Sequence, residues 1–303
     1  MKKRVFEGIA TALVTPFSNG AIDYPAVERL IERQIALKVS ALVVAGTTGE
    51  APTLTREEWH SLAEYSVSVA RGRVPVLVGA GSNSTAEASS RARAAEDAGA
   101  DGVLVVTPYY NKASREGLVR HYEEVCASTG LPVIAYNVPS RTGVDMGVDV
   151  LEMIAKIPNF AGIKEASGSA ARCAHVISYF GDDVPVYSGS DEINLPVFSI
   201  GGAGAVSVLS NVLPNETVRM WDAVQKGNLD EARELSSAVA PLVSALFSEV
   251  NPIPVKALMS SQGVIGDEIR LPLYPLSEDK KNRLAVEYGK AVMKIKGIIR
   301  GRR

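Results

Sequence analysis

A lysine, Lys164, lies inside the short apolar run FAGIKEA, where a solvated side chain is not expected. Side chains alternate between the two faces of a strand, so Lys164 shares its face with Gly162 and Ala166, which leave room for the lysine stem and for a ligand. Burial disfavours the ammonium form, and a neutral amine forms Schiff bases with carbonyl compounds. The run predicts a nucleophilic lysine. The alternative is a strand-end lysine whose amine reaches water.

Polar side chains also follow other apolar runs. One run ends in GTTGE (46–50), whose hydroxyls and flexible backbone suit a carboxylate ligand. Two later runs end in TPYYN (107–111) and YNVPSRTG (136–143), which place tyrosines and Arg141 at strand ends. Each motif has a structural alternative, namely a core tyrosine, a plain turn or a surface ion pair. All of these alternatives would have to coincide on one rim, so the joint pattern favours a catalytic site.

The elements that position these residues follow an alternating pattern. Eight apolar runs of the kind found in buried parallel strands alternate with amphipathic helical stretches, which predicts a (β/α)₈ TIM barrel. Barrel active sites lie at the C-terminal ends of the strands, where the motifs fall. A doubly wound open sheet is the alternative, but no Gly-rich nucleotide loop follows the first run. The predicted strands are 8–15, 41–46, 75–79, 102–107, 132–137, 161–165, 185–188 and 204–208.

Helices are expected between these strands and beyond them. Thr55 with Glu58 and Ser84 with Glu87 have the spacing of capping boxes at helix starts. Amphipathic stretches predict helices over residues 27–39, 57–71, 85–98, 229–247, 255–262 and 278–299.

The strand pattern stops before residue 227. We therefore expect two domains, a catalytic barrel over residues 1–226 and a C-terminal helical domain over residues 227–303. The helical domain is expected to serve packing or oligomerisation.

Composition limits the classes of partner. A net charge of −2 and a pI near 6.0 give no electrostatic case for nucleic acid binding. No apolar segment reaches the roughly 20 residues of a membrane-spanning helix. Cys126 and Cys173 lack metal-ligand spacing and are typical of reduced core residues. We expect a cytoplasmic protein without nucleic acid or membrane partners. No catalytic metal is expected, since His60, His121 and His175 fall in helical stretches.

Five motifs together resemble one family. GTTGE, TPYYNK (107–112), YNVPSRTG, GIKEASG (162–168) and NPIPVK (251–256) match the dihydrodipicolinate synthase family, within the N-acetylneuraminate lyase superfamily of class I pyruvate aldolases. The resemblance covers essentially the whole chain. It implies a lyase that condenses pyruvate with L-aspartate 4-semialdehyde, the first committed step of diaminopimelate and lysine biosynthesis. It implies no cofactor.

The resemblance also implies roles for particular residues. Lys164 would form the Schiff base, and Tyr136, Thr47 and Tyr110 would form a proton relay. Tyr110 would come from a neighbouring subunit of a homotetramer built from two tight dimers. The matching substrate-binding positions are Thr48 for the pyruvate carboxylate, Arg141 for the semialdehyde, and Gly189 and Val206 for the pocket lining.

Many members of this family bind lysine at an allosteric site. Asn83, Glu87 and Tyr109 match its polar positions here. Arg56 and Trp59, however, stand where lysine-sensitive members carry histidines. A cation at position 56 would repel a lysine ligand, so we expect weak or absent feedback inhibition.

Other functions compete with this interpretation. N-acetylneuraminate lyase or another keto-sugar-acid aldolase would keep the Schiff base on Lys164, but those relatives generally lack arginine at the Arg141 position. An enzyme holding pyridoxal phosphate would need a Gly-rich phosphate loop, and no convincing one is present. A non-catalytic barrel leaves the convergence of lysine, tyrosines and threonines unexplained.

Overall fold

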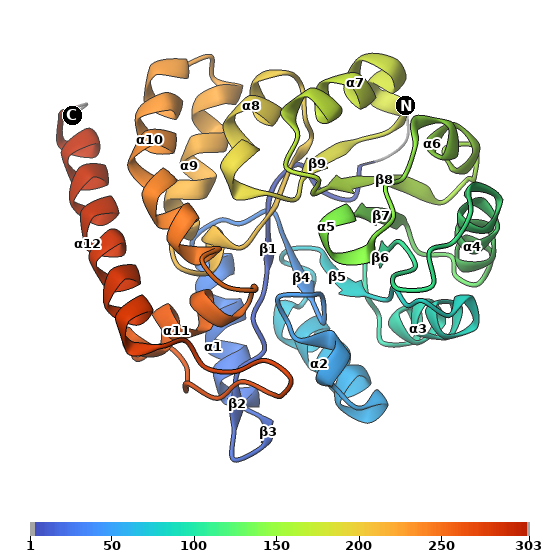
Figure 1. Ribbon diagram of the computed structural model, residues 1–303, viewed down its shortest axis with the longest axis horizontal. Helices are drawn as coiled ribbons and strands as arrows, with labels where there is room; N and C mark the ends of the chain where they lie inside the picture. Colours follow the sequence, from blue (N-terminus) through green and yellow to red (C-terminus); the bar gives the residue numbers. More distant parts are fainter. Residues whose placement is uncertain (1–3, 302–303) are drawn as a thin grey trace.

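Eight parallel strands close into a barrel in the computed structural model, which describes residues 4–301 (Figure 1). Each strand pairs with the next one of the barrel along the chain, and the last pairs with the first. The predicted TIM barrel is confirmed, although the first strand ends at Ala12 and not at Thr15. The strands are β1 (Gly8–Ala12), β4 (Ala41–Val44), β5 (Val76–Gly79), β6 (Gly102–Val106), β7 (Val133–Asn137), β8 (Phe160–Glu165), β9 (Val186–Ser188) and β10 (Gly204–Ser207).

Helices surround the barrel, so the outer face of the sheet is buried as well as the inner one. The inner face holds a small cluster that includes Leu77, Ile134 and Tyr187, while the outer face packs against the helices. Burial on both sides explains why the strands read as continuous apolar runs. The helices around the barrel are α1 (Tyr24–Ala36), α2 (Arg56–Ala70), α3 (Thr85–Asp97), α4 (Arg115–Ala127), α5 (Pro139–Thr142), α6 (Val148–Ile154), α7 (Ala170–Phe180), α8 (Asn194–Ser199) and α9 (Pro214–Gln225).

Short elements join these helices and strands. A hairpin of β2 (Phe17–Ser18) and β3 (Ala21–Ile22) follows the first strand, and its two turn residues, Asn19 and Gly20, have φ of 53° and 79°. The dipeptide Asn-Gly favours a turn with positive φ at both residues, so this hairpin could have been predicted from the sequence. The 3₁₀ helices are η1 (Ala51–Thr53), η2 (Gly181–Asp183), η3 (Asp191–Ile193) and η4 (Leu209–Asn211).

The two predicted capping boxes have different outcomes. At the start of α2 the Thr55 and Glu58 side chains each accept a hydrogen bond from the other's backbone N–H, so this box is confirmed. At the start of α3 the Ser84 side chain accepts from the backbone of Glu87, but the Glu87 carboxylate turns to two arginines. The prediction of the second box is therefore wrong for the bond from the Ser84 backbone N–H to the Glu87 side chain. A charged arginine competes better for the carboxylate than a backbone N–H does.

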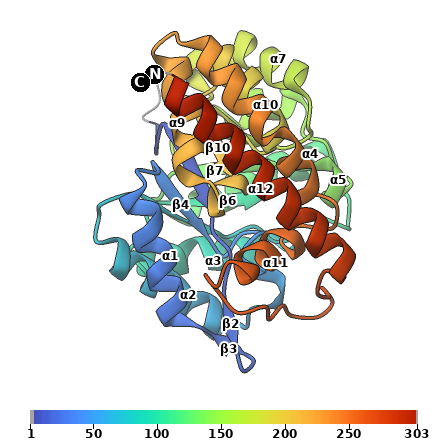
Figure 2. The same cartoon turned by 90° about the vertical axis from the view of Figure 1, so that its left-hand side faces the viewer.

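The C-terminal segment is helical, as predicted. It consists of α10 (Leu229–Leu246), α11 (Ile253–Ser261) and α12 (Glu278–Gly301), and α12 runs along α10 at one side of the barrel (Figure 2). Residues of α10 and α12 belong to the same buried apolar cluster as the outer face of the barrel. A boundary at residue 226 remains a prediction, and residues 1–3 and 302–303 of the two predicted domains lie outside the described chain. Within residues 4–301, no helix is both long and apolar enough to cross a membrane.

Candidate active site

Lys164 lies in β8 with its side chain in the barrel interior. It is only 6% exposed, so it is not a strand-end lysine with its amine in bulk water. Lys164 is paired in register with Tyr136 of β7, and its Nζ lies 4.0 Å from the centroid of the tyrosine ring. Ala166 packs on the inner cluster and Ile163 on the outer one, as strand alternation predicts. The buried amine therefore lies beside a phenol at the C-terminal end of the barrel.

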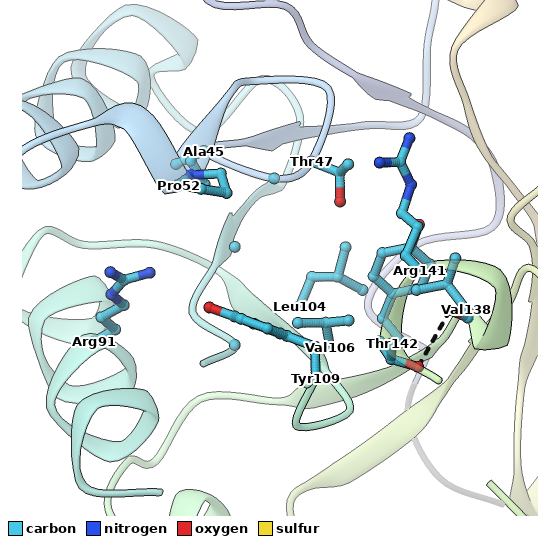
Figure 3. Close-up of a pocket in the computed structure, with 15 residues that line it drawn as sticks. Ala45, Thr47, Pro52, Arg91, Leu104, Val106, Tyr109, Val138, Arg141 and Thr142 are labelled. Atoms are coloured by element: carbon cyan, nitrogen blue, oxygen red, sulfur yellow. Dashed lines mark hydrogen bonds between the residues drawn. The ribbon is translucent and has the colours of Figure 1, made fainter. Parts of the chain in front are cut away.

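A pocket of about 320 Å³ opens at this end of the strands (Figure 3). Four of the predicted site residues line it, and they come from three strand ends: one residue follows β4, one follows β6, and two belong to β7 and to α5 directly after it. Figure 3 shows Thr47 and Arg141 on one side of the pocket and Arg91 on the other, with the Tyr109 hydroxyl pointing toward Arg91. The predicted residues that line the pocket are Thr47, Tyr109, Tyr136 and Arg141.

Lys164 and the two predicted lining positions at later strands, Gly189 and Val206, are not among the residues that line this pocket. Lys164 adjoins it through its contact with the ring of Tyr136, which does line the pocket. Val206 is buried in the inner cluster. A Cβ atom on Gly189 would lie 3.1 Å from the Lys164 Cε and 2.6 Å from the Ala166 Cβ. Glycine at position 189 thus leaves the space that the lysine stem occupies.

This contact predicts the result of replacing Gly189. Gly189→Ala should displace Lys164 and lower kcat for the reaction of the site by about 10- to 100-fold, since misplacement of a reacting group by about 1 Å has effects of this size. The matched control is Gly289→Ala in α12, where an added Cβ meets no atom within 4 Å. Steady-state kinetics of both variants are the measurement. Equal activity of Gly189→Ala and the parent chain would contradict this account of the lysine pocket.

Asn251 joins two of the predicted binding residues. Its side-chain Nδ2 donates to the Oγ1 of Thr48 at 2.9 Å, and its backbone carbonyl accepts from Nη2 of Arg141 at 3.1 Å. Thr48 is 3% exposed and Asn251 6% exposed, so the contact between their side chains is shielded from water. The segment that precedes α11 thus reaches back to two strand ends of the barrel.

A buried ion pair fixes the end of the GTTGE loop, which also contains Thr47 and Thr48. The Glu50 carboxylate accepts from Nζ of Lys256 at 2.5 Å and from the backbone N–H of Arg270 at 3.0 Å, and Lys256 also donates to the carbonyl of Thr15. Burial lowers the pKa of Lys256, against the attraction of the Glu50 carboxylate. The side chains of Glu50 and Lys256 are 0% and 2% exposed. The Thr47–Thr48 loop is therefore tied down by α11 and by the loop before α12.

No role was predicted for Asn251 or Lys256, although both lie in the motif NPIPVK. Lys256 carried the same signal as Lys164, a cation within an apolar stretch, and could have been predicted to be buried. Nothing in the sequence indicated which groups would surround either residue, because their partners are more than 100 positions away in the chain.

Tyr110 does not reach the pocket of its own chain. It is 88% exposed and has a positive φ of 73°. Within one copy, therefore, the structure brings Tyr136 and Thr47 to the site but leaves Tyr110 on the surface.

The residues of the expected lysine site surround a neutralised carboxylate. Glu87 pairs with Nη2 of Arg56 at 2.8 Å and with Nε of Arg91 at 3.0 Å. Burial opposes the ionisation of Glu87, but the two arginines outweigh it and lower the pKa of the carboxyl. Trp59 is buried, and its indole N–H donates to the carbonyl of Gly79.

The other polar positions of this site lie close by. The carbonyl of Asn83 accepts from the Asn111 side chain, and Tyr109 lines the pocket beside Arg91. No group of three or more histidine, cysteine, aspartate or glutamate side chains within residues 4–301 has the arrangement of a metal site.

Comparisons with known proteins point to one family. The model of the dihydrodipicolinate synthetase family matches residues 5–290. A relative from Syntrophus aciditrophicus, named 4-hydroxy-tetrahydrodipicolinate synthase, is 46% identical over 97% of this chain and all of its own length. One from Alkaliphilus oremlandii with the same name is 45% identical over 94% of this chain and 99% of its own.

A solved structure supports the same relationship. The 4-hydroxy-tetrahydrodipicolinate synthase of Methylacidiphilum fumariolicum SolV superposes with a TM-score of 0.95 and 40% identity, over 97% of this chain and 98% of that one. A match of the family model over nearly all of the sequence, with relatives this similar, is decisive. The chain belongs to the dihydrodipicolinate synthetase family.

Proposed function

We propose that this chain is a 4-hydroxy-tetrahydrodipicolinate synthase, a lyase that condenses pyruvate with L-aspartate 4-semialdehyde in the route to diaminopimelate and lysine. The observation that carries the proposal is the buried amine of Lys164, with its Nζ 4.0 Å from the Tyr136 ring at the end of the barrel that holds the pocket. The similarity of nearly the whole chain to proteins of this name supports it.

The reaction begins at the Lys164 amine. The amine attacks the ketone carbon of pyruvate, and loss of water gives a protonated imine. The imine withdraws electrons from the neighbouring methyl group, which loses a proton and becomes an enamine. The enamine carbon then forms a bond with the aldehyde carbon of the semialdehyde. The amino group of the second substrate attacks the imine carbon, which closes the ring and releases Lys164 as a free amine.

The proton transfers need a relay near the imine. A phenol with an ordinary pKa of about 10 is a poor base at neutral pH, so coupling to further hydroxyls is needed. Thr47 and Tyr136 line the same pocket and supply two members of that relay. We assign the third to Tyr110 of a second copy of the chain, because the tyrosine is 88% exposed in a single copy. A homotetramer made of two tight dimers is the proposed assembly.

This assignment predicts complementation between two impaired variants. Lys164→Ala lacks the nucleophile and Tyr110→Phe lacks the relay hydroxyl, so each homo-oligomer should lose most of its activity. When the two are mixed and reassembled, dimers with one chain of each kind contain one intact site, and activity should rise well above the sum of the parents. The measurement is the rate after subunit exchange. Activity that stays at the sum would show that Tyr110 does not act across an interface.

Both substrates carry carboxylates that need binding groups. Thr48 and the neighbouring backbone amides bind the pyruvate carboxylate, and Gly189 and Val206 shape the space beside Lys164. The planar guanidinium of Arg141 suits the carboxylate of the semialdehyde, and Arg141 lines the pocket. Arg141 favours this reaction over cleavage of polyhydroxylated sugar acids, which is the alternative activity of the superfamily.

We further propose that L-lysine inhibits this enzyme weakly or not at all. The carboxylate of Glu87, which would attract the ligand's ammonium groups, is already paired with Arg56 and Arg91. Arg56→His should increase sensitivity to lysine by about 5-fold, since an exposed charge contributes up to about 1 kcal/mol. Inhibition curves for L-lysine are the measurement, with the exposed Arg120→His as control. Strong inhibition of the parent chain at low lysine would refute the proposal.

The activity itself is tested by a coupled assay. Pyruvate-dependent consumption of L-aspartate 4-semialdehyde is followed through the NADPH-linked reductase that takes the product, and NADPH oxidation is the readout. Activity that requires both substrates supports the synthase. A protein of verified oligomeric state that shows no activity in this assay but cleaves keto-sugar acids would instead be assigned to the sister aldolases. An absorbance scan of the purified protein tests for pyridoxal phosphate.

A further inference from the structure

Asn251 makes one side-chain hydrogen bond in the structure, and that bond is to a predicted ligand-binding hydroxyl. Its Nδ2 donates to Thr48 Oγ1 at 2.9 Å. The other amide atom, Oδ1, is buried and receives no hydrogen bond from the described residues. The side chain is therefore held at this place by its contact with Thr48 and by the packing around it.

The direction of this hydrogen bond determines whether the Thr48 hydroxyl donates or accepts toward a ligand. A threonine hydroxyl has one proton to donate and two lone pairs that accept. Because the asparagine amide donates, one lone pair of Thr48 is occupied and the hydroxyl proton must point to a different acceptor. Among the described residues no acceptor for this proton is recorded. A carboxylate, which at neutral pH only accepts, is the kind of ligand that completes the arrangement.

We propose that Asn251 is a positioning residue that sets the substrate selectivity of the site by holding the Thr48 hydroxyl as a donor toward the carboxylate of the 2-oxo acid. This inference rests on the proposed function, in which Thr48 binds the pyruvate carboxylate. Through its backbone carbonyl the same residue accepts from Arg141, the group assigned to the carboxylate of the second substrate. One residue of the helical segment thus orients the recognition groups for both substrates.

Recognition of the carboxylate can be tested separately from the reaction at the ketone. Lys164 forms an imine with any accessible ketone, so borohydride trapping can compare pyruvate with hydroxyacetone, a ketone without a carboxylate. Asn251→Asp keeps the size of the side chain but puts an acceptor where the donor stands. The Thr48 proton then turns to the aspartate. Trapping of pyruvate should fall by about 10- to 100-fold, the scale of a lost hydrogen bond to a charged group, while trapping of hydroxyacetone stays within about 2-fold.

A second variant distinguishes this role from packing. Asn251→Ala removes the side chain but leaves the Thr48 hydroxyl able to rotate, so its loss of pyruvate trapping should be smaller than that of the isosteric Asn251→Asp. A residue that served only as structure would give the opposite order, and both ketones would be affected alike. Repulsion of pyruvate by the new carboxylate would persist in a Thr48→Val background, whereas an effect that acts through the Thr48 hydroxyl disappears there. Asn19→Asp, in the exposed hairpin turn, is the matched control for the amide-to-acid change.

The outcomes separate this inference from the proposed function. If the parent chain fails to trap pyruvate on Lys164, the proposed function fails. If the parent traps pyruvate and Asn251→Asp reduces trapping of both ketones equally, or of neither, the inference about Asn251 is wrong and the function stands. Selective loss of pyruvate, with the KM for pyruvate raised more than kcat is lowered, is the expected result.

Discussion

Lys164→Ala is expected to reduce kcat by about 10⁴-fold or more, because removal of a covalent nucleophile leaves only the binding contribution of the site. The variant should still fold. Alanine fills less of the space beside Gly189 and Tyr136, and it leaves no charge inside the barrel. Pyruvate should no longer become attached to the protein when borohydride is added.

Two measurements check this result together. The coupled assay gives the loss of turnover, and the mass of the borohydride-treated protein shows whether pyruvate has been attached. Lys290→Met is the control, since Lys290 is a solvent-exposed lysine of α12 and should keep both activity and trapping. Trapping of pyruvate by Lys164→Ala would show that a different amine is the nucleophile.

Lys256→Met is expected to lower the free energy of unfolding by about 3–5 kcal/mol, the usual cost of removing one partner from a buried ion pair. The Glu50 carboxyl group would stay buried with only the backbone N–H of Arg270 as a hydrogen-bond donor. Since Glu50 follows Thr47 and Thr48 closely in the chain, the variant should also raise the KM for pyruvate.

Denaturant unfolding at a fixed protein concentration measures this effect, because assembly into the proposed tetramer would make the stability depend on concentration. Lys290→Met is again the matched control: the Lys290–Glu287 pair is an i,i+3 pair on the helix surface and should contribute at most about 1 kcal/mol. The double variant Glu50→Gln with Lys256→Met should recover part of the loss, since it leaves no unpaired charge. Equal effects of Lys256→Met and Lys290→Met would contradict the role of burial.

The barrel could be predicted from the sequence because its signal is local. Each strand is a short apolar run bounded by turn residues, and burial on both faces makes that run continuous. Lys164 was predicted for the same reason, since a cation within such a run conflicts with its surroundings. The convergence of the motifs was also predictable, because parallel strands of a barrel end at one rim. The structure agrees, since Lys164 pairs in register with Tyr136.

Contacts between distant segments could not be predicted in this way. The link from Thr48 through Asn251 to Arg141 joins three parts of the chain that no periodicity relates. The capping box at Ser84 failed for a similar reason: the spacing to Glu87 was correct, but Arg56 comes from another helix and takes the carboxylate. Local patterns specify which elements form, whereas the choice among competing partners depends on the three-dimensional arrangement.

The position of Asn251 and Lys256 after the last strand has a consequence for how the protein is made. All eight strands, with Lys164 and Tyr136, are synthesised before the segment that contacts Thr48 and Glu50. A chain that ends prematurely before Asn251 therefore has the proposed nucleophile but lacks the groups that hold the Thr47–Thr48 loop. The proposed site for the 2-oxo acid is therefore complete only in a chain that has been translated up to Arg270.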